Sequence, residues 1–96
     1  MVNILNKVRF KNTIILAKRS NCDLFNLMLG ELNLLKEKYK EKYDYFILEE
    51  NIFNKFFNLN NKTYPNIVII KNTETIINIT GFRKLDYVIN ILDKIN

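Results

Sequence analysis

A single proline followed by a block of β-branched residues limits the possible folds of this chain more than any other feature. Pro65 is the only proline in the sequence, and residues 67–70 read Ile-Val-Ile-Ile. Proline lacks an N–H group, so in a sheet it occurs at the first residue of a strand or at an edge. A β-branched block bounded by turn residues is typical of a buried strand. We therefore expect a buried strand just after Pro65, followed by a hairpin turn, a returning strand and a helix at residues 71–74, 75–80 and 83–95.

The remaining elements are indicated by short apolar blocks and by apolar residues at helical spacing. We expect strands at 13–17 and 45–48, a long helix that opens at Cys22 and Asp23 and ends near Lys42, and a short helix at 52–57 with Phe53, Phe56 and Phe57 facing inward. Gly30 lies inside the long helix, where glycine costs about 1 kcal/mol relative to alanine, so it indicates a bend or a close packing contact. Tyr39 and Tyr43 are expected to be exposed and to cover the end of this helix.

This order of elements predicts a single α/β domain over residues 1–96, in which the elements follow each other as βαβαββα after an uncertain first one. A strand, a long helix and a second strand imply a right-handed parallel crossover, and the C-terminal hairpin adds antiparallel strands. We expect a mixed sheet of four or five strands with helices on both faces. Residues 1–11 fit either a helical face or a short edge strand, and they are a candidate for a truncated first element.

The composition predicts a domain that folds without disulfides or metal. Apolar residues make up 48% of the 96 residues, which is enough for a core. No apolar run approaches the roughly 20 residues of a membrane span, and the N-terminus has no signal-peptide pattern, so we expect no membrane association. Cys22 is the only cysteine and has no internal partner. We therefore expect a reducing, cytoplasmic setting.

Residue content and charge pattern disfavour two classes of function. The sequence has no histidine, which removes His-based zinc sites, Ser-His or Cys-His nucleophile pairs and histidine acid–base catalysis. The net charge is +5, but the densest charged run, residues 36–42, alternates in sign. Alternating charges are typical of a solvated helix face. Nucleic-acid binding is therefore the weakest of the functions considered.

Four features together resemble the thioredoxin superfamily. Cys22 lies between a buried strand and a long helix, and Gly30, eight residues later, falls where the family's helix is typically bent by a proline. Pro65 lies 43 positions after Cys22, where the family has its cis-proline, and Tyr64 before it resembles the disulfide-isomerase branch. The pattern PNIVIIKNTETIINITGF fits the family's strand, Lys-Asn turn, strand and glycine. The resemblance covers residues 12–96 and implies a thioredoxin-like fold with a cis peptide bond before Pro65.

The chain departs from this family at the active-site motif. The family's Cys-x-x-Cys is here Cys-Asp-Leu-Phe, residues 22–25, so phenylalanine replaces the resolving cysteine. Asn21 replaces the tryptophan before the motif, and the family's buried acid falls near Leu16. A cysteine at the start of a helix still has its thiolate favoured by the helix dipole and by nearby cations. The chain thus keeps the family's attacking cysteine but lacks the resolving cysteine, the tryptophan and the buried acid.

Two hypotheses follow from the resemblance. In the first, the chain is a monothiol thioredoxin-like protein of cell redox homeostasis whose catalytic Cys22 attacks a protein or peptide disulfide, or takes up glutathione as co-substrate, and so forms a mixed disulfide. Asn21, Phe25, Tyr64 and Pro65 then form the substrate-binding surface. In the second, the chain is a redox-inactive binding module that holds an extended peptide beside the Tyr64-Pro65 turn. Loss of the second cysteine favours the second hypothesis, and retention of Cys22 favours the first. The oligomeric state stays open.

Overall fold

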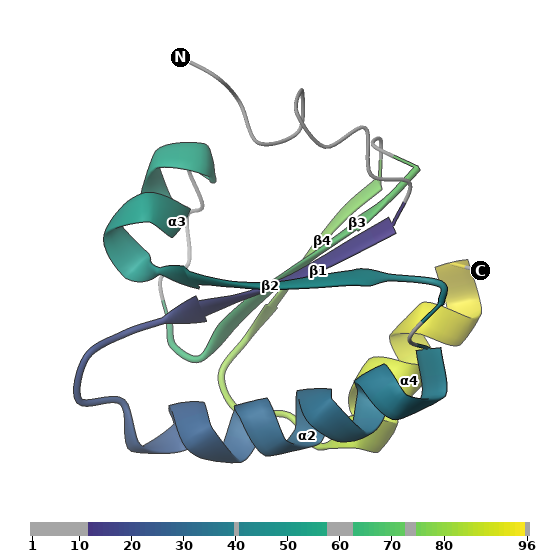
Figure 1. Cartoon of the computed structure of the whole chain (residues 1–96), viewed down its shortest axis with the longest axis horizontal. Helices are drawn as coiled ribbons and strands as arrows, with labels where there is room; N and C mark the ends of the chain where they lie inside the picture. Colours follow the sequence, from purple (N-terminus) through teal and green to yellow (C-terminus); the bar gives the residue numbers. More distant parts are fainter. Residues whose placement is uncertain (1–11, 40, 58–62, 73–74, 96) are drawn as a thin grey trace.

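The computed structural model describes residues 12–39, 41–57, 63–72 and 75–95 (Figure 1). The elements in these ranges follow the predicted order. They are β1 (Asn12–Lys18), α2 (Asp23–Tyr39), β2 (Asp44–Glu49), α3 (Glu50–Phe56), β3 (Asn66–Lys71), β4 (Thr75–Thr80) and α4 (Leu85–Ile95). The predictions for residues 1–11, for the loop at 58–62 and for part of the turn at 71–74 lie outside the described residues.

The described strands form one mixed sheet in the order β2-β1-β3-β4. β1 pairs with β2 in parallel, as the strand–helix–strand crossover predicts, and β3 pairs antiparallel with both β1 and β4. The register of β1 and β3 sets Ala17 opposite Asn66. The carboxyl end of β1 therefore lies beside the start of β3, where Pro65 is found. The prediction of a mixed sheet is confirmed.

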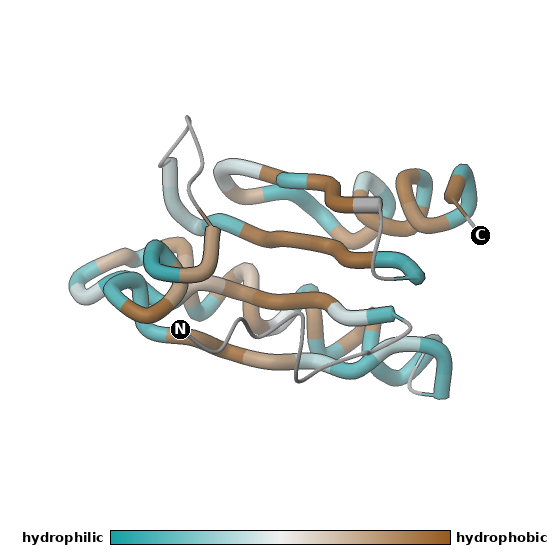
Figure 2. The backbone as a smooth tube through the Cα atoms, turned by 90° about the horizontal axis from the view of Figure 1, so that it is seen from above, coloured by the Kyte–Doolittle hydropathy of each residue, from teal (hydrophilic) through white to brown (hydrophobic). Residues whose placement is uncertain are grey.

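Helices cover both faces of this sheet, as predicted (Figure 1). Successive residues of a strand point to opposite faces, so Leu16 and Ile67 pack with α2 and α4, whereas Ile15 and Val68 pack with Phe53 of α3. The central parts of the strands are largely hydrophobic, and hydrophilic residues lie near their ends (Figure 2). Each fully buried aliphatic side chain contributes about 1.5 to 3 kcal/mol of transfer free energy. In the described part of the chain, no helix is long and apolar enough to cross a membrane.

α2 ends at Tyr39, earlier than the predicted end near Lys42. The N–H groups of Lys42 and Tyr43 both donate to the carbonyl of Tyr39, at 3.0 and 3.2 Å, so the chain turns back at this point. The turn places the Tyr43 ring edge-on to that of Tyr39, with centroids 6.2 Å apart. The two tyrosines are 7% and 3% exposed, and the Tyr39 hydroxyl donates to Asp93 of α4 at 3.0 Å. The expectation that they are exposed is therefore wrong, because burying two large rings outweighs one more helical turn.

α3 begins at Glu50, directly after β2 and earlier than predicted. Phe53 and Phe57 are buried with ring centroids 5.1 Å apart, and Phe56 is half-buried. The N–H of Phe57 donates to the carbonyl of Phe53 at 2.9 Å and closes the helix. The predicted inward face is thus confirmed for Phe53 and Phe57 and only partly for Phe56.

Gly30 has no packing role within the described structure. α2 runs through it without interruption, and a Cβ atom added at Gly30 would meet nothing within 4 Å. The predicted close packing contact is therefore absent. The glycine weakens the helix without a compensating contact inside the chain.

We expect Gly30→Ala to raise the free energy of unfolding by about 0.5 to 1 kcal/mol, because alanine has the higher helix propensity and restricts the unfolded chain. Urea unfolding of dilute protein measures this change. Gly81→Ala is the matched control with the opposite sign, because Gly81 has φ +77° and a side chain there costs about 1 to 2 kcal/mol. A destabilised Gly30→Ala variant would contradict the assignment of Gly30 to open helix surface.

Tyr45 of β2 has a buried hydroxyl that makes no hydrogen bond. Burial, and to a lesser extent the nearby phenols of Tyr43 and Tyr39, raises the pKa of Tyr45 to about 12. Burial and the hydrogen bond to Asp93 also raise the pKa of Tyr39. In both cases the folded state favours the neutral phenol.

The contribution of these two tyrosines to stability is therefore expected to be constant below about pH 10 and to fall between about pH 10 and 12, where the unfolded chain loses phenolic protons that the folded chain keeps. The urea midpoint at a series of alkaline pH values measures this loss. Tyr45→Phe should make the loss smaller, and the part due to Tyr39 should remain. An identical pH dependence in wild type and Tyr45→Phe would contradict the assignment to Tyr45.

Candidate functional site

The loop between β1 and α2 positions the single cysteine. Cys22 directly precedes Asp23, the first residue of α2, and its carbonyl accepts the N–H of Phe25 at 3.1 Å. Asn21 has φ 60°, in the left-handed region that asparagine adopts more readily than most residues. The chain therefore turns sharply at Asn21 and enters the helix with Cys22 at its start. The Cys22 side chain is partly buried and packs against the core on the α2 face.

An open hollow of about 410 Å³ surrounds this loop. It is lined by Lys18, Arg19, Ser20, Asn21, Cys22, Asp23, Phe25 and Asn26. The lining is mostly polar, and it combines two cationic side chains with one carboxylate. Cys22 thus borders a hollow that is open to solvent.

The Tyr64-Pro65 turn lies at the start of β3. The Tyr64-Pro65 peptide bond is cis, and Pro65 is buried. The carbonyl of Pro65 accepts the N–H of Gly81 at 2.8 Å, which fixes the turn to the end of β4. Because Ala17 pairs with Asn66, this turn lies beside the end of β1, from which the Cys22 loop departs.

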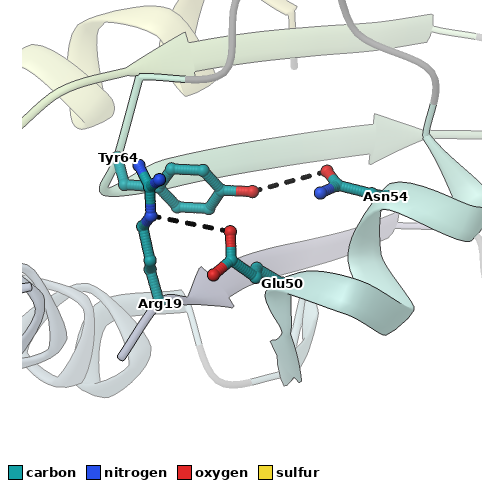
Figure 3. Close-up of polar contacts among 4 residues, drawn as sticks. All are labelled: Arg19, Glu50, Asn54 and Tyr64. Atoms are coloured by element: carbon teal, nitrogen blue, oxygen red, sulfur yellow. Dashed lines mark hydrogen bonds and ion pairs between the residues drawn. The ribbon is translucent and has the colours of Figure 1, made fainter. Parts of the chain in front are cut away.

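A cluster of four polar or aromatic side chains connects the loop, the turn and α3 (Figure 3). The guanidinium carbon of Arg19 lies 5.0 Å from the centroid of the Tyr64 ring, and Arg19 Nε lies 3.6 Å from Glu50 Oε2. The Tyr64 hydroxyl donates to Asn54 Oδ1 at 3.4 Å. The ion pair is partly exposed, so it contributes less than about 1 kcal/mol. The ion pair with Glu50 holds the Arg19 guanidinium over the Tyr64 ring.

The structure brings the predicted site residues to two adjoining places. Cys22, Asn21 and Phe25 line the hollow, and Tyr64 and Pro65 form the neighbouring turn. Phe25 is only 8% exposed and packs mainly into the core on the α2 side of the sheet. Lys18 Nζ lies 5.6 Å from the centroid of the Phe25 ring. Phe25 therefore forms the floor of the hollow more than its rim.

Sequence reasoning missed Glu50 and Asn54, which hold Arg19 and Tyr64. The parallel pairing of β1 and β2 sets Lys18 opposite Glu49, so the residues that follow them, Arg19 and Glu50, also meet. The sequence signal for this ion pair was therefore a basic residue just after one predicted strand and an acidic residue just after the strand that pairs with it in parallel. In the described part of the chain, no group of three or more histidine, cysteine, aspartate or glutamate side chains lies close enough to hold a metal ion.

Comparison with known proteins decides the fold class. No family model and no curated protein matches the chain. Chloroplastic thioredoxin z is similar to the chain with a TM-score of 0.75 and 17% identity, over 88% of this chain and 78% of its own. The chain has the thioredoxin fold. A thioredoxin-2 from the malaria parasite matches with a TM-score of 0.74 and 16% identity, over 88% of this chain and 82% of its own.

The likeness to the thioredoxin fold covers 88% of this chain. A solved structure of a malarial protein matches with a TM-score of 0.75 and 16% identity, over 88% of this chain and 96% of that protein. At such low identity the likeness shows the fold, and the chemistry has to be argued from this chain's own residues. The resemblance drawn from Cys22, Gly30 and the Tyr64-Pro65 turn is confirmed as a statement about the fold.

Proposed function

We propose that this thioredoxin-fold protein exchanges disulfides through the single thiol of Cys22. The observation that carries the proposal is the position of Cys22 at the start of α2, where it lines an open hollow of about 410 Å³. The adjoining Tyr64-Pro65 turn supplies main-chain groups for an extended substrate. The substrates are disulfides of proteins or peptides, or of glutathione, in a reducing, cytoplasmic setting.

The exchange proceeds in three steps. The Cys22 thiolate attacks one sulfur of the substrate disulfide, the substrate S–S bond breaks, and the departing thiolate takes up a proton. The product is a mixed disulfide between Cys22 and the substrate. Glutathione then attacks the substrate sulfur of this bond, which releases the Cys22 thiolate and leaves a disulfide between glutathione and the substrate, because Phe25 has no sulfur to resolve the adduct. A second glutathione attacks the glutathione sulfur of that disulfide, which gives glutathione disulfide and the fully reduced substrate.

Trapping the mixed disulfide tests the proposal. Reduced protein is incubated with a disulfide-linked peptide, the reaction is quenched with acid, and the intact mass is measured. We expect one adduct per chain that reduced glutathione removes. If the unfolded chain forms the adduct and the folded protein does not, the proposal is wrong.

A second candidate is a binding module without redox chemistry, which the position of Phe25 favours. Phe25 stands where the family has its resolving cysteine, and it is 8% exposed within the core. A buried ring at this position is compatible with peptide binding and excludes intramolecular resolution. Equal binding of a cysteine-free extended peptide by wild type and Cys22→Ser, without any adduct in the trapping experiment, would identify this role.

A further inference from the structure

α2 carries three exposed leucines, Leu24, Leu27 and Leu34, and the two most exposed of them lie on its outer face. Leu27 and Leu34 are 57% and 56% exposed, and they lie seven residues apart, so they share one side of the helix. The side of α2 that faces the core is formed by Met28, Leu32 and Leu35, which are buried. Figure 1 shows α2 along the outside of the molecule, with the sheet on its inner side and α4 next to it. Leu27 and Leu34 therefore form an apolar stripe on open surface.

Gly30 lies on the same stripe, between the two leucines. It is exposed, and an added Cβ would meet nothing within the chain. A glycine in a helix interior costs about 1 kcal/mol relative to alanine. Nothing inside the described chain requires this glycine. A second helix crossing α2 at Gly30 would come closest to it with glycine there, because the distance between packed helices depends on the side chains at the crossing point.

The ends of the stripe carry opposite charges. Asp23 lies in the first turn of α2 and Lys38 in the last, both exposed. Suppose two copies of α2 pack antiparallel about a twofold axis that passes between residues 30 and 31. Leu27 then faces the partner's Leu34, and Asp23 faces the partner's Lys38. This single axis brings the leucines together and places opposite charges face to face. In a parallel pair of helices, each Asp23 would instead face the partner's Asp23.

We propose that a second copy of this chain docks on the stripe Asp23, Leu27, Gly30, Leu34 and Lys38 in this antiparallel arrangement. The stripe is complementary in charge to itself, and this favours a second copy of the chain as the occupant. The contact is small, so the dimer is weak and forms at high protein concentration. Asp23 also lines the hollow of Cys22, and the contact therefore reaches the rim of that hollow. The dimer forms whether or not Cys22 exchanges disulfides.

Sedimentation velocity of the full chain from about 5 to 500 µM tests the proposal, because mass action shifts a weak dimer over such a range. We expect a concentration-dependent dimer whose dissociation constant rises at least about tenfold in Leu27→Gln and in Leu34→Gln, which keep the helix propensity. Ile76→Thr, at an exposed apolar residue of β4, is the control and should dimerise as wild type does. A wild type that stays monomeric at all concentrations, or a Leu27→Gln variant that dimerises normally, overturns the proposal.

Charge reversal tests the antiparallel register. Asp23→Lys and Lys38→Glu should each be monomeric alone, because each opposes like charges in both copies of the contact. Mixed in equal amounts, they should form a heterodimer, because every pair is then of opposite sign. Failure of the mixture to associate overturns the register.

Gly30→Ala adds a third readout. It should stabilise the monomer and yet weaken the dimer, because the added methyl group separates the crossing helices. Circular dichroism confirms folding of each variant. An unchanged dissociation constant in Gly30→Ala would contradict a crossing at this residue.

Discussion

Replacing Cys22 with serine is expected to abolish disulfide exchange, with a loss of at least about a hundredfold in the rate of peptide disulfide reduction by glutathione. The reason is chemical. The attacking species is a thiolate, a serine hydroxyl does not ionise at neutral pH, and the chain has no other cysteine to substitute for it. The measurement is glutathione oxidation coupled to a reporter peptide disulfide. Because Cys22 is partly exposed at the helix start, the variant should fold normally.

Ser20→Ala is the matched control, since Ser20 lines the same hollow and supplies no sulfur. It should keep an exchange rate within a few-fold of wild type. Exchange by Cys22→Ser at the wild-type rate would show that the observed reaction does not pass through this protein's thiol. Exchange lost in both variants would instead indicate damage to the loop.

Phe53→Ala is expected to lower the free energy of unfolding by about 3 to 5 kcal/mol, the usual effect of removing a fully buried phenylalanine ring. Phe53 is 0% exposed and packs against Phe57 and the face of the sheet that α3 covers. The loss is a large part of the roughly 5 to 15 kcal/mol by which small domains are stable. α3 also carries Glu50 and Asn54, so the contacts to Arg19 and Tyr64 should loosen with it. Chemical denaturation measures the stability change.

Ile52→Ala provides the comparison on the same helix. Ile52 is adjacent to Phe53 but 40% exposed, so its truncation should cost no more than about 1 kcal/mol. Equal effects of the two substitutions would mean that α3 does not pack as described.

Much of the fold was predictable because its signals are local. The β-branched block at 67–70 lies in the buried strand β3, and the apolar block at 13–17 lies in β1, in the centre of the sheet. The helical spacing after Cys22 became α2. These patterns follow directly from which residues a buried strand or an amphipathic helix can accept.

The features that sequence reasoning missed depend on contacts between distant segments. Tyr39 and Tyr43 are aromatic residues in a charged stretch, and they are buried in the core where α2 ends and the Tyr39 hydroxyl donates to Asp93 of α4. Glu50 and Asn54 joined the site through the pairing of two strands and the start of α3. No pattern of neighbouring residues indicates such contacts between distant segments. The single cysteine at the start of a helix, in contrast, could be recognised in the sequence.

The rate at which Cys22 reacts with a peptide disulfide, measured in the folded protein and in the same protein unfolded in denaturant, tests the central claim most directly. If the fold serves exchange, the hollow and the Tyr64-Pro65 turn position the substrate disulfide against the thiol. We predict that the folded protein reacts at least about tenfold faster than the unfolded chain at the same pH, after correction for the effect of denaturant on a free cysteine peptide. A folded protein that reacts more slowly than the unfolded chain would contradict the claim and leave the binding module as the function of this fold.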